Sequence, residues 1–334
     1  MKKIVSVMLI MVMLVSSLAL VGCGKTDDKE SITLKVNIGE NEEHGQGILI
    51  ATFKEKIEEL SGGQIKVQLY YNSSLYNPDA TVPAVKNGEL EMTLTSFQIT
   101  ADYYAPIALF SMPFLFEDYD HMRKVMDSEI GDELAEKVKE TAGYYPLGYT
   151  YNGSRQLNLR TTNPVTKPED MAGVVLRMPS AEAWINVGES LGASVAPLAY
   201  SEVYTALQTG TIDAQDNPLP AVNTMKFYEV TEQISLTNHI VDAVLVIINN
   251  DVWDSLTEEQ QGWMKEAVDV AVKACDEVML EQEAELLTFF KNEGLMIVEP
   301  DVDAFAKHAY DYYVNKGLTA NWDMDLYEEI RSMK

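Results

Sequence analysis

The chain has 334 residues, 46% of them hydrophobic, and a formal net charge of −27. This hydrophobic content supports large cores, and the length predicts two domains. So large an excess of acidic residues repels the phosphate backbone, which argues against nucleic acid as a partner, and it also disfavours anionic lipid surfaces.

The first segment has the pattern of a bacterial export signal. Lysines at positions 2 and 3 precede a charge-free apolar run at 4–21 that ends in small residues, an order typical of secretory signals. The run is also long enough to span a membrane as a helix. The sequence Leu-Val-Gly-Cys at 20–23 favours export, because it resembles the lipobox, whose cysteine receives a diacylglyceryl group. We therefore expect a lipoprotein signal peptide over 1–22 and a lipidated Cys23.

A polar segment follows at 24–31 and cannot bury a core, so 23–31 is expected to be a lipidated tether. Two acyl chains anchor a protein stably where one is marginal. The expected location is therefore the extracytoplasmic face of the cell membrane, with the bilayer as a partner through acylated Cys23. The second cysteine, Cys275, then has no disulfide partner, and its helical surroundings favour a core position over a nucleophile.

The first part of the chain alternates between strand and helix patterns. Strands are predicted at 32–38 and 65–69, with a helix between them at 45–60. A short helix at 82–87 and a strand at 90–95 follow. Strand, helix and strand in this order predict a parallel sheet, and hence an α/β domain.

The second part repeats this alternation with other residues. Strands are predicted at 148–151, 174–178 and 212–214, and helices at 182–191 and 201–209.

Two longer patterns come later in the chain. The almost wholly apolar run at 241–248 predicts a strand that is buried on both faces. The run at 257–292 predicts one long helix, which begins with a Thr257/Gln260 capping box and ends before Gly294. A helix of that length either kinks or passes from one domain to the other.

Motifs for catalysis and for cofactors are missing from the sequence. Its four histidines, His44, His121, His239 and His308, show no metal-ligand spacing. There is no phosphate loop and no dinucleotide fingerprint. Acid–base catalysis by carboxylates stays open in a chain with 52 acidic residues, although no pair stands out. We therefore predict no cofactor, no metal and no catalytic residue, and we favour binding over catalysis.

Arginine is rare and clustered, since three of the five arginines lie within 155–177. A guanidinium is suited to bidentate contact with a carboxylate. These arginines could equally be surface charges or members of internal ion pairs. The five are Arg123, Arg155, Arg160, Arg177 and Arg331.

Several sequence blocks, in their order, resemble the substrate-binding subunits of tripartite ATP-independent periplasmic (TRAP) transporters, in the branch that binds sialic acid and C4-dicarboxylates. The blocks are Met-Pro-Phe-Leu-Phe at 112–116, Gly-Tyr-Thr-Tyr-Asn-Gly-Ser-Arg at 148–155, Pro-Glu-Asp-Met-Ala-Gly-Val-Val-Leu-Arg-Met-Pro at 168–179, and 200–210 with 212–218, 227–230 and 237–239. The resemblance spans nearly all of the chain after the tether.

This resemblance implies an α/β, two-domain periplasmic-binding-protein-like fold, in which hinge strands and a long helix connect the domains. The chain would cross between them near residues 152, 241 and 280. Domain I would then comprise 32–152 with 241–280, and domain II 153–240 with 281–334.

The resemblance also implies roles for individual residues. Arg177 would pair with the substrate carboxylate, Arg155 would support it, and Asn217 would donate a hydrogen bond to it. Tyr200 would form an aromatic wall of the cleft, and Ser180 would face the cleft.

The sequence departs from the family pattern at Ala214, where glycine is usual, and at Asp216, where glutamate is usual. On the first domain, Glu40, Asn41 and Ser96 follow predicted strands. They are candidate ligand contacts because loops at the carboxyl ends of strands face the cleft in open α/β sheets.

By this resemblance the protein captures a small organic acid, either a sugar acid such as sialate or a uronate or a C4-dicarboxylate. It would close by hinge motion, act as a monomer and deliver the acid to a TRAP permease. The alternatives are an extracytoplasmic enzyme acting on acidic sugars and a ligand sensor for a membrane receptor.

Overall fold

The computed structural model describes residues 31–334. The predicted signal peptide, the lipidated Cys23 and most of the tether lie outside the described residues. No helix within 31–334 is long and apolar enough to cross a membrane.

The described strands form one nine-stranded sheet in the order β2-β1-β3-β8-β4-β7-β5-β6, with β9 paired to β8. Their bounds are β1 (Ile32–Asn37), β2 (Ile65–Tyr70), β3 (Met92–Ser96), β4 (Tyr144–Leu159), β5 (Val175–Met178), β6 (Ser194–Pro197), β7 (Ala214–Pro218), β8 (Gln233–Asn249) and β9 (Met296–Val298). The predicted parallel pairing of the first two strands is confirmed, since β1 pairs β2 in register from Ile32↔Ile65 onward.

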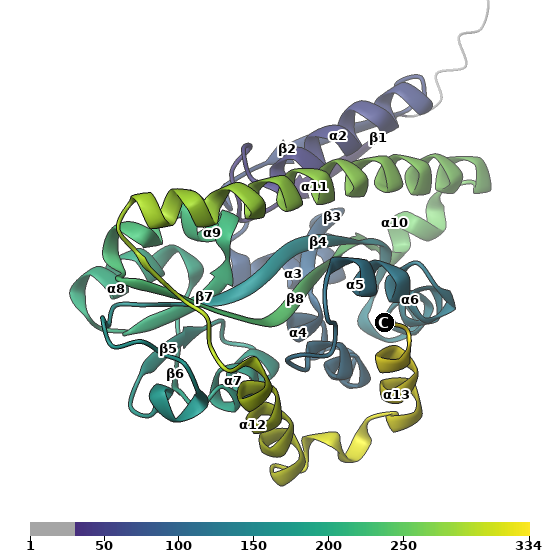
Figure 1. Ribbon diagram of the computed structural model, residues 1–334. Coiled ribbons are helices and arrows are strands. Elements are labelled where there is room, and N and C mark those ends of the chain that lie inside the picture. Colours follow the sequence, from purple (N-terminus) through teal and green to yellow (C-terminus); the bar gives the residue numbers. More distant parts are fainter. Residues whose placement is uncertain (1–30) are drawn as a thin grey trace, which may run out of the picture.

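Strands β4 and β8 connect the two halves of the molecule. They pair antiparallel along nearly their whole length. The carboxyl-terminal half of β8 pairs with β3 of the first half, and its first residues pair with β9. The pairing of β4 with β8 shifts register between Tyr151 and Gly153 and again between Arg155 and Leu157. Figure 1 shows this pair crossing the middle of the molecule between two groups of helices.

Helices cover both faces of the sheet. The first half contains α2 (Gly45–Leu60), α3 (Pro78–Lys86), α4 (Phe97–Thr100), η1 (Ala105–Ser111), α5 (Tyr119–Met126), α6 (Glu129–Ala142) and α10 (Asn250–Ser255). The second half contains η2 (Pro168–Met171), α7 (Glu182–Ser190), η3 (Tyr200–Glu202), α8 (Val203–Thr209), α9 (Leu219–Thr224), η4 (Phe227–Val230) and α12 (Val302–Asn315). The remaining helices are α11 (Glu258–Asn292), η5 (Leu318–Asn321) and α13 (Met324–Ser332).

Three apolar clusters form the core. The largest lies in the first half and contains Leu34, Phe53 and Leu245. The other two lie in the second half, one around Leu176 and one around Phe290. The separate clusters agree with a two-domain fold.

Helix α11 passes from one half to the other, which is one of the two outcomes that its length allowed. It begins at the predicted capping box, in which Thr257 and Gln260 exchange hydrogen bonds. Cys275, a buried free thiol, belongs to the first-half cluster, whereas Phe290 near the helix end belongs to a second-half cluster. The long helix lies across the top of both halves in Figure 1.

The last helix corrects the domain boundary drawn from the sequence, which assigned all of 281–334 to the second domain. Helix α13 packs on the first half, because Ile330 is fully buried in the first-half cluster. The imidazole Nε2 of His121 lies 2.8 Å from the Ile330 carbonyl oxygen, and Arg331 donates to the Phe114 carbonyl at 2.7 Å. The chain therefore returns to the first half after α12, which lies beside α7 of the second half (Figure 1).

Candidate functional site

A cavity of about 220 Å³ lies between the two halves. Its first-half wall comes from the ends of β1 and β3 and from α2 and α3, and its second-half wall from the end of β5 and from α7, η3 and β7. The predicted site residues that line it are Glu40, Ser96, Arg155, Arg177, Ser180, Tyr200 and Asn217.

Arg177 lies on β5 and is 3% exposed. Its Nε donates to the Leu198 carbonyl at 2.8 Å, and its guanidinium carbon lies 5.7 Å from the centroid of the Tyr200 ring. No carboxylate within 31–334 forms a salt bridge with it. Burial lowers the pKa of Arg177 to about 10, so it stays charged at neutral pH.

A buried charge without a counterion is costly, and a bound anion removes that cost. The terminal nitrogens of Arg177 have no hydrogen-bond partner in the part of the chain that the structure describes. Because the residue lines the cavity, these nitrogens are the donors best placed to bind a carboxylate there.

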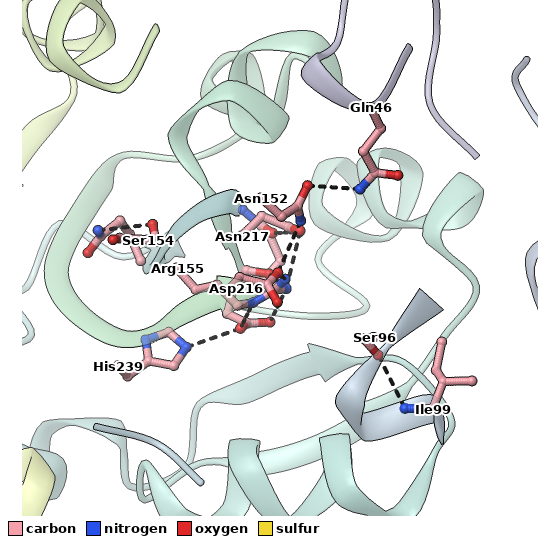
Figure 2. A network of polar contacts seen from close by, with 12 residues as sticks. Gln46, Ser96, Ile99, Asn152, Ser154, Arg155, Asp216, Asn217 and His239 are labelled. Atoms are coloured by element: carbon pink, nitrogen blue, oxygen red, sulfur yellow. Dashed lines mark hydrogen bonds and ion pairs between the residues drawn. The ribbon is translucent and has the colours of Figure 1, made fainter. Parts of the chain in front are cut away.

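Arg155 lies in a different electrostatic environment, in which its charge is already balanced. Its Nε donates to Asp216 at 2.7 Å and its Nη1 to Asp242 at 2.9 Å, and all three side chains are nearly inaccessible to solvent. The guanidinium carbon lies 4.5 Å from the centroid of the Trp184 ring. Figure 2 shows Arg155 beside Asp216 in this polar cluster. Arg155 therefore has little free capacity to clamp a ligand carboxylate.

Asp216 is the centre of that cluster. Nε2 of His239 lies 3.1 Å from its carboxylate, and Nδ1 of the same ring lies 2.7 Å from the Thr237 hydroxyl. Burial alone would raise the pKa of Asp216, but Arg155 and His239 hold it well below its usual range. The aspartate that replaces the usual glutamate thus carries a stable negative charge.

The polar cluster continues into the first half. Asn152, at the register shift of β4, donates to Asp242 at 3.0 Å and accepts from the amide of Gln46 on α2 at 2.8 Å. Figure 2 shows this line of contacts running from Gln46 through Asn152 to the cluster. One hydrogen-bonded network therefore connects the two cavity walls where the strands cross.

Asn217 and Tyr200 are placed by other side chains of the second half. The Asn217 carbonyl oxygen accepts from Arg155 at 3.2 Å, and its amide donates to Gln215. The Tyr200 ring meets Phe227 edge-on, with centroids 6.1 Å apart.

Two of the first-half candidates have local structural roles. Ser96 lines the cavity, but its hydroxyl caps α4 by accepting from the Ile99 amide at 3.2 Å (Figure 2). Asn41 is not among the lining residues. Its side-chain oxygen accepts from the backbone amides of Glu43 and His44, which fixes the turn before α2.

Glu40 lines the cavity and is half-buried. Within the described residues its carboxylate forms no salt bridge and no hydrogen bond with another side chain, although the backbone amides of Gly39 and Glu40 lie close enough to favour its charged form. Burial, together with the neighbouring charge of Asp242, raises its pKa to about 7.

Asp242, Thr95 and His44 are polar lining residues that were not among the predicted site residues. Asp242 is the single charge in the run at 241–248, and a lone charge in a buried strand is itself a signal of an internal ion pair. Thr95 has a buried hydroxyl oxygen without a partner. Nδ1 of His44 accepts from the Gln46 amide, and burial lowers the pKa of His44 to about 4, so the neutral ring keeps its proton on Nε2. The sequence carried no comparable signal for Thr95 or His44.

Residues 31–334 contain no group of histidine, cysteine, aspartate or glutamate that could hold a metal ion.

The sequence matches the family described as bacterial extracellular solute-binding protein, family 7, over residues 37–316. It is 33% identical over 259 residues to the sialic acid-binding periplasmic protein SiaP of Vibrio cholerae, covering 78% of this chain and 80% of that protein. It is 31% identical over 262 residues to the 2,3-diketo-L-gulonate-binding periplasmic protein YiaO of Escherichia coli, covering 78% and 79%.

The fold is similar to that of a TRAP periplasmic solute-binding protein from Roseobacter denitrificans, solved with bound 3-deoxy-D-manno-oct-2-ulosonic acid. The TM-score is 0.86, with 36% identity, over 91% of this chain and all of the other.

Proposed function

Because this chain belongs to family 7 of the bacterial extracellular solute-binding proteins, which are binding proteins and not enzymes, we propose that it captures a small organic acid in the cavity between its two halves. The carboxylate of the acid would pair with Arg177. The observation that carries this proposal is the buried guanidinium of Arg177, which lines the cavity and has no counterion within the described residues.

The ligands named for the relatives support an acidic solute. They are sialic acid, 2,3-diketo-L-gulonate and 3-deoxy-D-manno-oct-2-ulosonic acid. Each is a small hydroxylated acid. A sugar acid or a C4-dicarboxylate would bring the carboxylate that Arg177 lacks.

The test is a thermal-shift screen of the soluble part, residues 26–334, against sugar acids and dicarboxylates, followed by calorimetric titration of Arg177→Ala. Removing one partner of a buried ion pair costs about 3–5 kcal/mol, which corresponds to a loss of roughly 200- to 5,000-fold in affinity. Arg160→Ala is the matched control, because Arg160 is half-exposed and outside the cavity lining. Affinity that survives Arg177→Ala would refute the assignment.

Under the same proposal, the place where β4 and β8 pass between the two halves acts as a hinge. The two halves would rotate about β4 and β8 near residues 152 and 241, and along α11 near 280. The register shift between Tyr151 and Gly153 supports the first of these positions. Domain I would then include α13 in addition to 32–152 and 241–280.

We further propose that the protein is a lipoprotein, anchored by acylated Cys23, that delivers its ligand to a TRAP permease. The lipobox-like sequence at 20–23 and the transporter class of the structural relative support this. Cys23→Ser should release the protein from the membrane fraction. A sensor would bind the acid equally well, but only a transport protein should increase uptake of the labelled acid by cells that contain the permease.

A further inference from the structure

Among the residues that the structure describes, neither the carboxylate of Glu40 nor the guanidinium of Arg177 forms a salt bridge, and the two residues line opposite walls of the cavity. Building on the proposed function, we propose that Glu40 is a specificity-determining residue. It accepts hydrogen bonds from hydroxyl groups of an acid whose single carboxylate is held by Arg177, and it excludes acids that carry a second carboxylate.

The charges of the lining support one carboxylate per ligand. Of the two arginines, only Arg177 lacks a carboxylate partner, because Asp216 and Asp242 balance Arg155. The lining also contains the carboxylates of Glu40 and Asp79. A second ligand carboxylate would find no unpaired cation among the lining residues, and like charges placed together cost several kcal/mol.

The polar atoms on the first-half wall match hydroxyl groups. Glu40 supplies acceptor oxygens, His44 supplies an N–H donor at Nε2, and Thr95 has a buried hydroxyl without a partner. A ligand hydroxyl donates and accepts, so it can satisfy all three, whereas a carboxylate can only accept. Leaving such buried groups unpaired would penalise an acid without hydroxyls.

The charge on Glu40 depends on pH in the neutral range. The ionisable groups around it are Asp242 on β8, Tyr200 on η3, Asp79 on α3 and, elsewhere in the lining, His44 with the two arginines. None forms a salt bridge with it. Since its pKa is about 7, Glu40 is mostly neutral at pH 6 and mostly ionised at pH 8. Exclusion of a second carboxylate should therefore strengthen as the pH rises.

Matched pairs of sugar acids test this directly by titration calorimetry. The probes are erythronate with meso-tartrate, gluconate with glucarate, and galactonate with galactarate. Within a pair, the terminal CH₂OH of the aldonate is a carboxylate in the aldarate. At pH 8 we expect the wild-type protein to bind at least one aldonate on the order of ten-fold or more tightly than its aldarate, and to discriminate less at pH 6.

Glu40→Gln keeps the shape of the side chain and removes its charge. It should weaken discrimination several-fold at pH 8 and make it independent of pH, mainly by improving aldarate binding. Glu43→Gln is the control, because Glu43 is an exposed neighbour outside the cavity lining and should change nothing.

Three results would overturn the role of Glu40 while leaving the proposed function intact. They are equal or tighter binding of aldarates by the wild-type protein at pH 8, unchanged discrimination in Glu40→Gln, and binding of succinate with no binding of any aldonate. Failure of every acid in the wider screen, or binding that survives Arg177→Ala, would instead refute the proposed function.

Discussion

Arg155 and Arg177 are both buried in the cavity wall, but their surroundings give them different energetic roles. Arg155 balances two buried carboxylates, which would themselves be unpaired without it. Within the described residues, Arg177 donates only to a backbone carbonyl, and burial lowers its pKa to about 10. The charged form of Arg177 is therefore disfavoured by folding, whereas that of Arg155 is required by its partners.

Substitution by methionine, which keeps an apolar side chain of similar length, should separate these roles in the ligand-free protein. Arg155→Met should lower the free energy of unfolding by about 3–5 kcal/mol, because it leaves Asp216 and Asp242 buried without a cation. Arg177→Met should leave the free energy of unfolding unchanged or raise it by up to about 2 kcal/mol. The reason is that the lowered pKa of Arg177 means that its charged form is less favourable in the folded than in the unfolded protein. Urea denaturation at pH 7 measures both changes. Equal losses in the two variants would contradict the distinction.

The family resemblance put Arg177 ahead of Arg155 as the expected partner of the carboxylate, but the sequence could not show how the surroundings of the two arginines differ. The motif at 168–179 contained Arg177, and the block ending at 155 contained Arg155. Which guanidinium stays unpaired depends on Asp216 from β7 and Asp242 from β8, which reach Arg155 only after three strands have paired. Glu40 could be placed after its strand, but its lack of a partner is a property of the folded cavity.

Gly153 occupies the point at which strand β4 passes between the halves. Its φ of +103° is in the region that only glycine adopts readily. A Cβ at this position would lie 2.5 Å from the Cβ of Pro218. Next to it, Glu283 of α11 accepts from the Ser154 amide and the Tyr151 hydroxyl, both at 2.6 Å. Helix α11 is therefore hydrogen-bonded to β4 at the proposed hinge.

Gly153→Ala should lower the free energy of unfolding by about 1–3 kcal/mol, because it combines a disfavoured backbone conformation with a contact that the proline ring cannot relieve. Gly262→Ala is the matched control within α11. No atom lies within 4 Å of a Cβ at Gly262, so alanine should stabilise the helix by about 0.5–1 kcal/mol. Denaturant titration of the two variants should give changes of opposite sign. A neutral Gly153→Ala would argue against a constrained crossing.

The long strands show why element boundaries were harder to predict than element types. The sequence indicated a strand only at 148–151, yet β4 extends from Tyr144 to Leu159. The alternation of apolar and polar residues is interrupted at Pro146, Gly148 and Gly153. These positions coincide with shifts in the register of the β4–β8 pairing, which continues on both sides of each shift. The first part of β8 was missed because most of its buried side chains are polar. Gln233, for example, is fully buried and donates to two loop carbonyls.

At the scale of the molecule, the cavity has walls from both halves and lies beside the strands that join them. Arg177 as a whole residue is 3% exposed, so a ligand must displace one wall to reach its guanidinium. Four parts of the described chain connect the halves: β4, β8, α11 and the segment between α12 and α13. Rotation about these connections would open the cavity without disturbing the separate apolar clusters.

Ligand should therefore convert an open population into a closed one, because contacts to both walls exist together only in the closed form. Small-angle scattering of the soluble part should show a smaller radius of gyration when a saturating acid is added. Arg177→Ala should keep the larger radius at the same acid concentration, whereas Arg160→Ala should contract like the wild-type protein. An unchanged radius in the wild-type protein, with binding verified in the same sample, would mean that the two halves do not move as rigid bodies. The ligand would then have to enter by local motion of the loops at the cavity rim, and the glycine at the strand crossing would be a packing requirement instead of a hinge.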